Sequence, residues 1–338
     1  MHSKWTVRVA PLLTLILLAP VTVSNADAAA ARPESARPAA CRPLLFATFL
    51  QPSYAVFQWS PARFDEELAD MTAIGINTVI LQWTVDMDAR QSYYPTPGTA
   101  YPTAMDIVGP LLNAAGAHGA KVWLGLGNVY SWQAHAGDDA WLTNQLVVDE
   151  RIADQLSAAY PNRFAGWYIS NEVDDSLLAN PTTARSIQRF FTTLSGYLHT
   201  HAGRAPVMAA PTYSGLHQST TAFAASVRSV MGSLDVLDVQ DGGGSGYIAP
   251  SDITNWFRAL HDALAKTPTA LWQDADMYGP DGAPMNPPAL QNDLAATCGL
   301  VVARSGFSFT SQMGPADLGT FTFYEAYRDF RTAVLATT

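Results

Sequence analysis

Positive charge is scarce in this chain of 338 residues, which holds 19 lysines and arginines against 29 aspartates and glutamates. Its formal net charge is −10 and its pI is about 5.0. Nucleic acids and anionic membranes are bound largely by lysines and arginines that neutralise phosphates. The composition therefore excludes both as principal partners and disfavours phosphorylated substrates.

Long apolar runs are missing beyond residue 23, so no later segment predicts a transmembrane helix. The one run, residues 9–23, follows Lys4 and Arg8 and precedes an Ala-x-Ala pattern that ends at Ala28. This order is typical of a cleaved export signal. We predict a signal peptide over residues 1–28, a disordered spacer over 29–40, and a secreted or periplasmic domain over 41–338.

Cysteine is almost absent, with Cys41 and Cys298 as the only two. In an exported protein such a pair is a candidate disulfide. A lipid attachment site at Cys41 is the rival interpretation. It is disfavoured because Cys41 lies far from the apolar run and Pro38 occupies the position where a Leu or Val is expected.

Several catalytic and cofactor motifs are also missing. No Gly-x-Gly-x-x-Gly follows the first predicted strand, and no Gly-x-Ser-x-Gly elbow occurs. The glycine run 242–244 is followed by no lysine, as a phosphate-binding loop requires. The histidines show no spacing typical of metal ligands. We therefore predict no cofactor and no metal.

What the chain does contain is a regular alternation of short apolar runs and longer amphipathic segments, typical of a parallel sheet with crossover helices. The predicted strands are Leu44–Leu50, Thr78–Trp83, Lys121–Leu126, Gly166–Ser170, Pro206–Ala210, Val236–Gln240, Ala270–Asp276 and Gly306–Ser311. The predicted helices are Pro61–Ile74, Met105–Ala117, Asp139–Ala159, Pro181–His201, His217–Met231, Pro250–Ala265, Pro287–Ala303 and Phe321–Leu335.

Eight strand–helix units over about 290 residues match a single (β/α)8 TIM barrel. An open doubly wound sheet is the alternative, but the number of units favours closure. The longest irregular insert, Asp86–Thr103, follows the second strand. In a barrel it lies on the C-terminal face, where active sites are built. We expect one domain and a monomer.

Barrel closure also bears on the cysteines, because it places the first strand beside the eighth. Cys41 directly precedes the first predicted strand, and Cys298 lies near the end of the helix that leads to the eighth. Both positions belong to the N-terminal rim. We therefore predict a Cys41–Cys298 disulfide.

Glu172 is the one glutamate at the end of a predicted strand, the fourth. Every other glutamate falls in the leader region or in a predicted helix. A carboxylic acid at the C-terminal end of a barrel strand, close to Trp167 and Tyr168, is typical of a general acid. The alternative is a structural glutamate that caps the following helix.

A second carboxyl group is available at the end of the seventh strand. Glycoside hydrolysis requires two carboxyl groups across the scissile bond, one protonated and one ionised. Asp276 lies as many residues from the start of its strand as Glu172 does, so we predict Asp276 as the partner. Asp274, one layer deeper, is the second choice. The alternative is that both aspartates bond loop amides.

The other strand ends carry amides, carboxylates and aromatic rings with almost no positive charge. Such groups bond hydroxyls and cover the apolar faces of sugar rings, so they predict a neutral carbohydrate as the substrate. Trp83, Trp132 and Tyr278 are the expected stacking platforms. The predicted substrate-binding residues are Gln51, Gln82, Trp83, Asn128, Trp132, Asn171, Tyr213, Gln240, Asp241, Asp274 and Tyr278.

The pair Asn171 and Glu172 resembles the signature of the large clan of retaining (β/α)8 glycosidases, whose acid/base glutamate follows an asparagine on the fourth strand. More closely, the chain resembles a family of bacterial glycosidase-like TIM barrels formerly catalogued as a domain of unknown function. The matching segments are Thr48–Gln51 with Trp59, Val79–Trp83, Gly166–Ile169 with Glu172, Asp238–Gly242 and Leu271–Tyr278.

One residue departs from that pattern. Both the clan and the family place a glutamate where this chain has Asp276. Its side chain is one methylene shorter, so the carboxyl lies about 1.5 Å further from the sugar unless the backbone moves inward. The resemblance implies a retaining glycoside hydrolase that acts on a polysaccharide or oligosaccharide. The alternatives are an inverting enzyme, or an exported carbohydrate-binding protein without activity.

Overall fold

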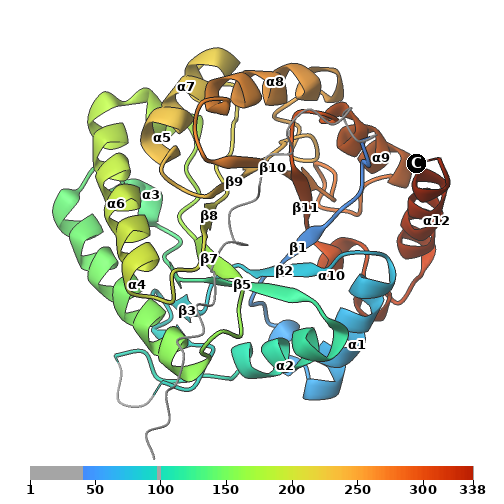
Figure 1. Ribbon diagram of the computed structural model, residues 1–338, viewed down its shortest axis with the longest axis horizontal. Helices are drawn as coiled ribbons and strands as arrows, with labels where there is room; N and C mark the ends of the chain where they lie inside the picture. Colours follow the sequence, from blue (N-terminus) through green and yellow to red (C-terminus); the bar gives the residue numbers. More distant parts are fainter. Residues whose placement is uncertain (1–40, 97–99, 338) are drawn as a thin grey trace, which may run out of the picture. The chain divides into compact units, whose positions relative to one another are not determined.

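The computed structural model describes residues 41–96 and 100–337, so the predicted signal peptide and spacer lie outside the described residues. Eight parallel strands form one sheet in the order β1-β2-β5-β7-β8-β9-β10-β11, curled into a ring (Figure 1). This arrangement confirms a single (β/α)8 barrel. The strands are β1 Ala47–Leu50, β2 Thr78–Leu81, β5 Lys121–Gly125, β7 Gly166–Ile169, β8 Val207–Ala209, β9 Val236–Gln240, β10 Ala270–Asp276 and β11 Ala303–Phe307.

The ring closes between β1 and β11. The Phe46 amide donates to the Arg304 carbonyl at 2.8 Å, and the Thr48 hydroxyl donates to the Gly306 carbonyl at 2.9 Å. Closure leaves few unpaired backbone groups at the sheet edges. It also brings residues more than 250 positions apart in the sequence into contact.

The two faces of each strand have different neighbours, because side chains alternate along a strand. Phe49, Tyr168 and Trp272 belong to a cluster that fills the barrel interior. Trp167 and Leu237 point the other way and join the core between the strands and the surrounding helices. This alternation determines which side chains at the strand ends face the barrel mouth.

Helices cover the outside of the ring (Figure 1). Several begin at side-chain caps: Ser60, Asp138, Asn180 and Ser219 each accept bonds from first-turn amides. Among the described residues, none of the helices has the length and apolarity to cross a bilayer. The helices are η1 Val56–Gln58, α1 Pro61–Ala73, α2 Val108–His118, α3 Trp132–His135, α4 Asp139–Ala159, α5 Asp175–Ala179, α6 Pro181–Thr200, α7 Thr220–Met231, η2 Pro250–Asp252, α8 Ile253–Leu264, α9 Pro287–Ala296, α10 Phe309–Gln312, α11 Pro315–Leu318 and α12 Thr322–Ala336.

The eighth strand corrects one prediction. It begins at Ala303 rather than Gly306, and residues 309–311, predicted as the end of the strand, belong to α10. The preceding helix ends at Ala296 rather than Ala303. The charged residue Arg304 did not fit the pattern of a buried strand, so the start of the strand was not predicted. Its guanidinium is buried and its Nε donates to the Leu294 carbonyl at 3.0 Å, a contact with the preceding helix.

The insert after β2 is also more regular than predicted. It contains β3 Val85–Asp86 and β4 Gln91–Ser92. In a small second sheet, β3 pairs with β4 on one side and with β6 Gly127–Asn128 on the other. These strands are too short to show a period in the sequence. The small sheet braces the loops after β2 and β5 on the C-terminal side of the barrel.

The Cys41–Cys298 disulfide is present, with Cα atoms 5.5 Å apart across a sequence separation of 257. It joins the segment before β1 to the segment before β11, as barrel closure predicted. Because the Cys41 sulfur is used in this bond, it is not a lipid attachment site.

Candidate active site

Glu172 lies beyond the C-terminal end of β7 and is partly exposed. It has the same parity as Tyr168, which points into the barrel interior. The side-chain amide of Gln82, from the end of β2, donates to Glu172 Oε1 at 3.0 Å. Desolvation raises the pKa of Glu172, and hydrogen bonds from Gln240 and Gln82 partly oppose that shift. Glu172 is therefore a largely desolvated carboxyl group with a tendency to hold its proton.

Asp276 is the last residue of β10 and is 3% exposed. Its Oδ2 accepts two hydrogen bonds from Ser245, one from the backbone amide and one from the hydroxyl, both at 2.9 Å. The Ser245 hydroxyl also lies 3.0 Å from that of Tyr278. Burial raises the pKa of Asp276, while the donors of Ser245 favour its ionised form.

Two more carboxyl groups lie deeper in the barrel. The Ser305 hydroxyl is 2.7 Å from Asp238 Oδ2 and 3.3 Å from Asp274 Oδ1. Burial raises the pKa of Asp238 to about 7. Burial, together with the charge of Asp238, raises the pKa of Asp274 well above its usual range. Both effects favour the protonated form of Asp274.

The surroundings of Asp274 indicate that Glu172 and Asp276, the two candidate catalytic groups, lie near the same buried residue. The charges of both Asp276 and Glu172 contribute to its raised pKa. Both carboxyl groups therefore lie within Coulombic reach of the same buried residue. The barrel brings Glu172 and Asp276, which are far apart in sequence, to one mouth.

Asp241 lies between β9 and β10 and bonds protein groups on both oxygens. Oδ1 accepts from the Gly243 amide at 3.0 Å and from the Asp276 amide at 3.3 Å, and Oδ2 accepts from Gln273 at 3.0 Å. Burial and the charge of Asp276 raise the pKa of Asp241 to about 8. Its side chain thus holds the loop after β9 against the end of β10.

Asn171 and Tyr213, predicted to bind substrate, have side chains that contact other parts of the protein instead of the two carboxyl groups. The Asn171 amide is buried and pairs with the Gln145 amide of α4, at 2.9 and 3.3 Å for the two bonds. The Tyr213 ring stacks on Trp256 with centroids 4.6 Å apart, and its hydroxyl donates to the Gln218 carbonyl. Both side chains support neighbouring segments in this structure.

The expected aromatic platforms differ in exposure. Trp83 and Trp132 are only 3% and 5% exposed, so their faces are covered. Tyr130 lies over Trp83 in an edge-to-face contact with ring centroids 6.1 Å apart. Tyr278, Gln240 and Asn128 are partly exposed, and Gln51 is exposed.

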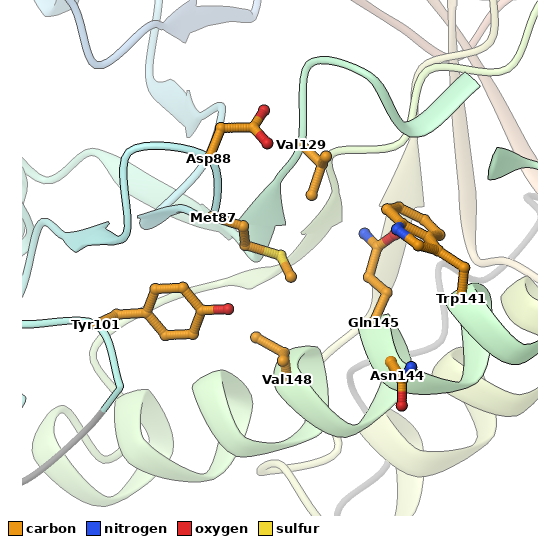
Figure 2. Close-up of a pocket in the computed structure, with 8 residues that line it drawn as sticks. All are labelled: Met87, Asp88, Tyr101, Val129, Trp141, Asn144, Gln145 and Val148. Carbon is orange, nitrogen blue, oxygen red and sulfur yellow. The ribbon is translucent and has the colours of Figure 1, made fainter. Parts of the chain in front are cut away.

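A cavity of about 290 Å³ lies beside the small sheet, with the Gln145 and Trp141 side chains of α4 on one side (Figure 2). Through Gln145 its wall reaches Asn171, the residue before Glu172. The lining combines aromatic, apolar and amide groups. Its residues are Met87, Asp88, Tyr101, Val129, Trp141, Asn144, Gln145 and Val148.

Ser245, Gln145 and Ser305 contact the candidate residues, yet sequence reasoning did not select them. Ser245 stands between glycines, where it indicated only flexibility. Its position in the loop after a predicted strand was the available signal. Within residues 41–96 and 100–337, no three histidine, cysteine, aspartate or glutamate side chains are arranged to bind a metal ion.

Residues 46–318 match the model of a family described as "Domain of unknown function (DUF4434)". A search of curated proteins finds no match. Among solved structures, the chain is similar to a "putative alpha-L-fucosidase" from Bacteroides thetaiotaomicron VPI-5482, with a TM-score of 0.71 and 20% identity, covering 90% of this chain and 98% of that one.

Two further structures have the same fold at lower similarity. An endo-1,4-beta-D-mannanase from Thermotoga petrophila RKU-1 has a TM-score of 0.55 and 12% identity, covering 86% of this chain and 99% of that one. Alpha-L-fucosidase isoenzyme 2 from Paenibacillus thiaminolyticus has a TM-score of 0.56 and 14% identity, covering 87% of this chain and 49% of that one. At these identities the similarity shows a shared barrel fold.

Proposed function

Because the chain belongs to the DUF4434 family and has the barrel fold of glycoside hydrolases, we propose that it is a glycoside hydrolase that uses Glu172 and Asp276. The observation that carries the proposal is the pair of carboxyl groups at one barrel mouth in different environments. Desolvation raises the pKa of both groups, but the amides of Gln240 and Gln82 bond Glu172, whereas the backbone amide and hydroxyl of Ser245 bond Asp276. We assign Glu172 as the acid and the Ser245-bound Asp276 as the ionised partner, because glycoside hydrolysis needs one carboxyl group of each kind.

In the proposed reaction, Glu172 gives its proton to the glycosidic oxygen as the bond to the anomeric carbon breaks. Asp276 forms the new bond to that carbon, and the leaving group departs as an alcohol. Glu172 then takes a proton from water, which attacks the same carbon and releases Asp276. Gln82 and Gln240, whose amides bond Glu172, orient its carboxyl group.

The partners and compartment follow from this assignment. The substrate is a polysaccharide or oligosaccharide, the enzyme is exported, and the disulfide accords with an oxidising compartment. The low exposure of Asp276 favours one second candidate, a carbohydrate-binding protein that has lost its nucleophile. Hydrolysis separates the two, because only the enzyme releases new reducing ends.

The proposal predicts that Glu172→Gln lowers kcat by about 10²–10⁴-fold while the fold is retained, because the amide keeps the shape of the acid but cannot donate a proton in this way. Reducing-end release from a panel of polysaccharides and 4-nitrophenyl glycosides measures the loss, and circular dichroism checks the fold. Glu150→Gln, on the outer helix α4, is the matched control and should retain activity.

Near-wild-type turnover by Glu172→Gln would disprove the acid assignment. NMR of the first-formed anomer tests Asp276 separately. Retention of configuration is expected if Asp276 is the nucleophile, whereas inversion would mean that Asp276 activates water instead.

A further inference from the structure

Exposed aromatic rings are distributed very unevenly over the described residues. Each tyrosine that is more than half exposed lies in a loop that follows the C-terminal end of a strand. These are Tyr54 after β1, Tyr130 after β6 and Tyr247 after β9, with exposures of 81%, 67% and 54%. The one other aromatic ring this exposed, Phe321, precedes α12 and packs edge-on against Tyr324 in the outer helical layer.

The loops that carry two of these rings are anchored. The Tyr130 amide donates to Asp88 at 2.9 Å, and its ring contacts Trp83 beneath it. The Tyr247 amide closes a turn on the Gly242 carbonyl at 3.0 Å, two residues from the Ser245 that bonds Asp276. A loop held in place in the unbound protein loses little conformational entropy when a ligand covers its ring.

The strands that precede these loops lie on opposite sides of the ring (Figure 1). β1 and β5 are separated by β2 alone, so Tyr54 and Tyr130 lie toward one side. β7 and β8 separate β5 from β9, while β10 and β11 separate β9 from β1, so Tyr247 lies toward the other side. A line across the mouth from the β1–β5 side to the β9 side has the end of β7 on one flank and the end of β10 on the other. It therefore crosses between Glu172 and Asp276.

The charged residues in the loops around the mouth limit the kind of polysaccharide that can bind there. In the described residues of the loops that follow the strand ends, Arg90 is the one lysine or arginine, whereas aspartates are frequent. A polymer of uronic or sulfated sugars would be repelled by such a face. Neutral sugars present apolar C–H faces to aromatic rings and hydroxyls to carboxylates, so they match both features.

We propose that Tyr54, Tyr130 and Tyr247 form a binding track for a neutral polysaccharide, which lies across the mouth and is cleaved within its chain. The cleavage part of this inference rests on the proposed function, whereas the binding part does not. Rings on both sides of the carboxyl pair hold sugars on both sides of the scissile bond. An enzyme that removes one terminal sugar needs such rings on one side at most.

The test compares wild type with the triple variant Tyr54→Ala, Tyr130→Ala and Tyr247→Ala. The probes are soluble galactomannan, xyloglucan, arabinoxylan, mixed-linkage β-glucan and anionic polygalacturonate, together with the matching 4-nitrophenyl glycosides. The triple Tyr→Phe variant keeps the rings. Val302→Ala removes an equally exposed apolar side chain next to β11, at its N-terminal end. Thermal melts confirm that each variant is folded.

We expect wild type to lower the viscosity of one neutral polymer before many reducing ends appear. The alanine variant should lose at least about tenfold in kcat/KM on that polymer, through KM, and less than about twofold on the glycoside. The phenylalanine and Val302→Ala variants should behave as wild type, and polygalacturonate should not be cleaved.

Equal activity of wild type and the alanine variant on the polymer would overturn the track while leaving the glycosidase assignment intact. So would hydrolysis confined to the 4-nitrophenyl glycosides or to polymer ends. A third outcome is that no probe is hydrolysed, while a neutral polymer retards wild type but not the alanine variant in affinity electrophoresis. In that case the binding track is supported and the proposed catalysis is wrong.

Discussion

Ser245 determines the local chemistry of Asp276 more directly than any other single residue. It donates twice to the same carboxylate oxygen, and its hydroxyl also meets that of Tyr278. Hydrogen bonds to a charged group contribute about 1.5–3 kcal/mol, and one pKa unit corresponds to about 1.36 kcal/mol. Ser245 therefore opposes, without cancelling, the desolvation that raises the pKa of Asp276.

Ser245→Ala removes the hydroxyl donor and keeps the backbone donor, so the pKa of Asp276 should rise further. The proposed reaction needs Asp276 ionised, and the acid limb of the kcat/KM profile should shift upward by about one pH unit. Activity above the limb should be nearly unchanged. Ser251→Ala, an exposed serine in η2, is the control. An unshifted acid limb would show that the hydroxyl does not control Asp276.

The loop between β9 and η2 is the element that completes the site. It carries Asp241, Ser245 and Tyr247, and it bends at Gly242, whose φ is +68°. At Gly244 an added Cβ would lie 1.9 Å from the Tyr278 carbonyl oxygen and 2.6 Å from the Asp276 Cβ. The loop thus packs directly on the end of β10, and glycine is required for that approach.

Gly244→Ala should therefore move the loop without unfolding the barrel. A displacement of about 1 Å at a catalytic group can cost about 10²-fold, so we expect a loss of that size in kcat. Gly196→Ala on α6, where an added Cβ meets nothing within 4 Å, is the control. It should retain activity and gain about 0.5–1 kcal/mol of stability. Full activity of Gly244→Ala would contradict the close packing of the loop.

At the scale of the whole barrel, within residues 41–96 and 100–337, buried acids are more numerous than buried cations. Burial raises the pKa of Glu67, Asp149 and Asp238 to about 7 each, and that of Asp293 to about 6. A raised pKa means that the folded state holds protons that the unfolded chain releases. Each group thus contributes stability that is complete below about pH 4 and is lost as the pH rises through its folded value.

The free energy of unfolding should therefore fall between about pH 4 and pH 8. We expect the melting temperature at pH 8 to lie at least about 4 °C below that at pH 5, measured by circular dichroism at constant ionic strength. Asp149→Asn, on α4 and outside the mouth, removes one such group and should reduce the difference. A melting temperature that rises toward pH 8 would contradict the sign of these shifts.

The sequence by itself determined the class of fold, and it predicted the two carboxyl groups that the proposed function uses. β9 and β10 have the predicted bounds, and six more units agree in type and order. A short apolar run and an amphipathic segment are visible because their periodicity depends on residues a few positions apart. Barrel closure and the Cys41–Cys298 bond then followed from the number of units.

Only the tertiary structure decided what each strand-end side chain faces. Trp83 is covered whereas Tyr130 is exposed, Asn171 turns to Gln145, and Ser245 meets Asp276. Burial and hydrogen bonding depend on partners that lie tens of residues away, which no local pattern records. The start of β11 was mispredicted for the same reason. A charged residue such as Arg304 is expected to be exposed, and only the tertiary structure shows that α9 accepts its hydrogen bond.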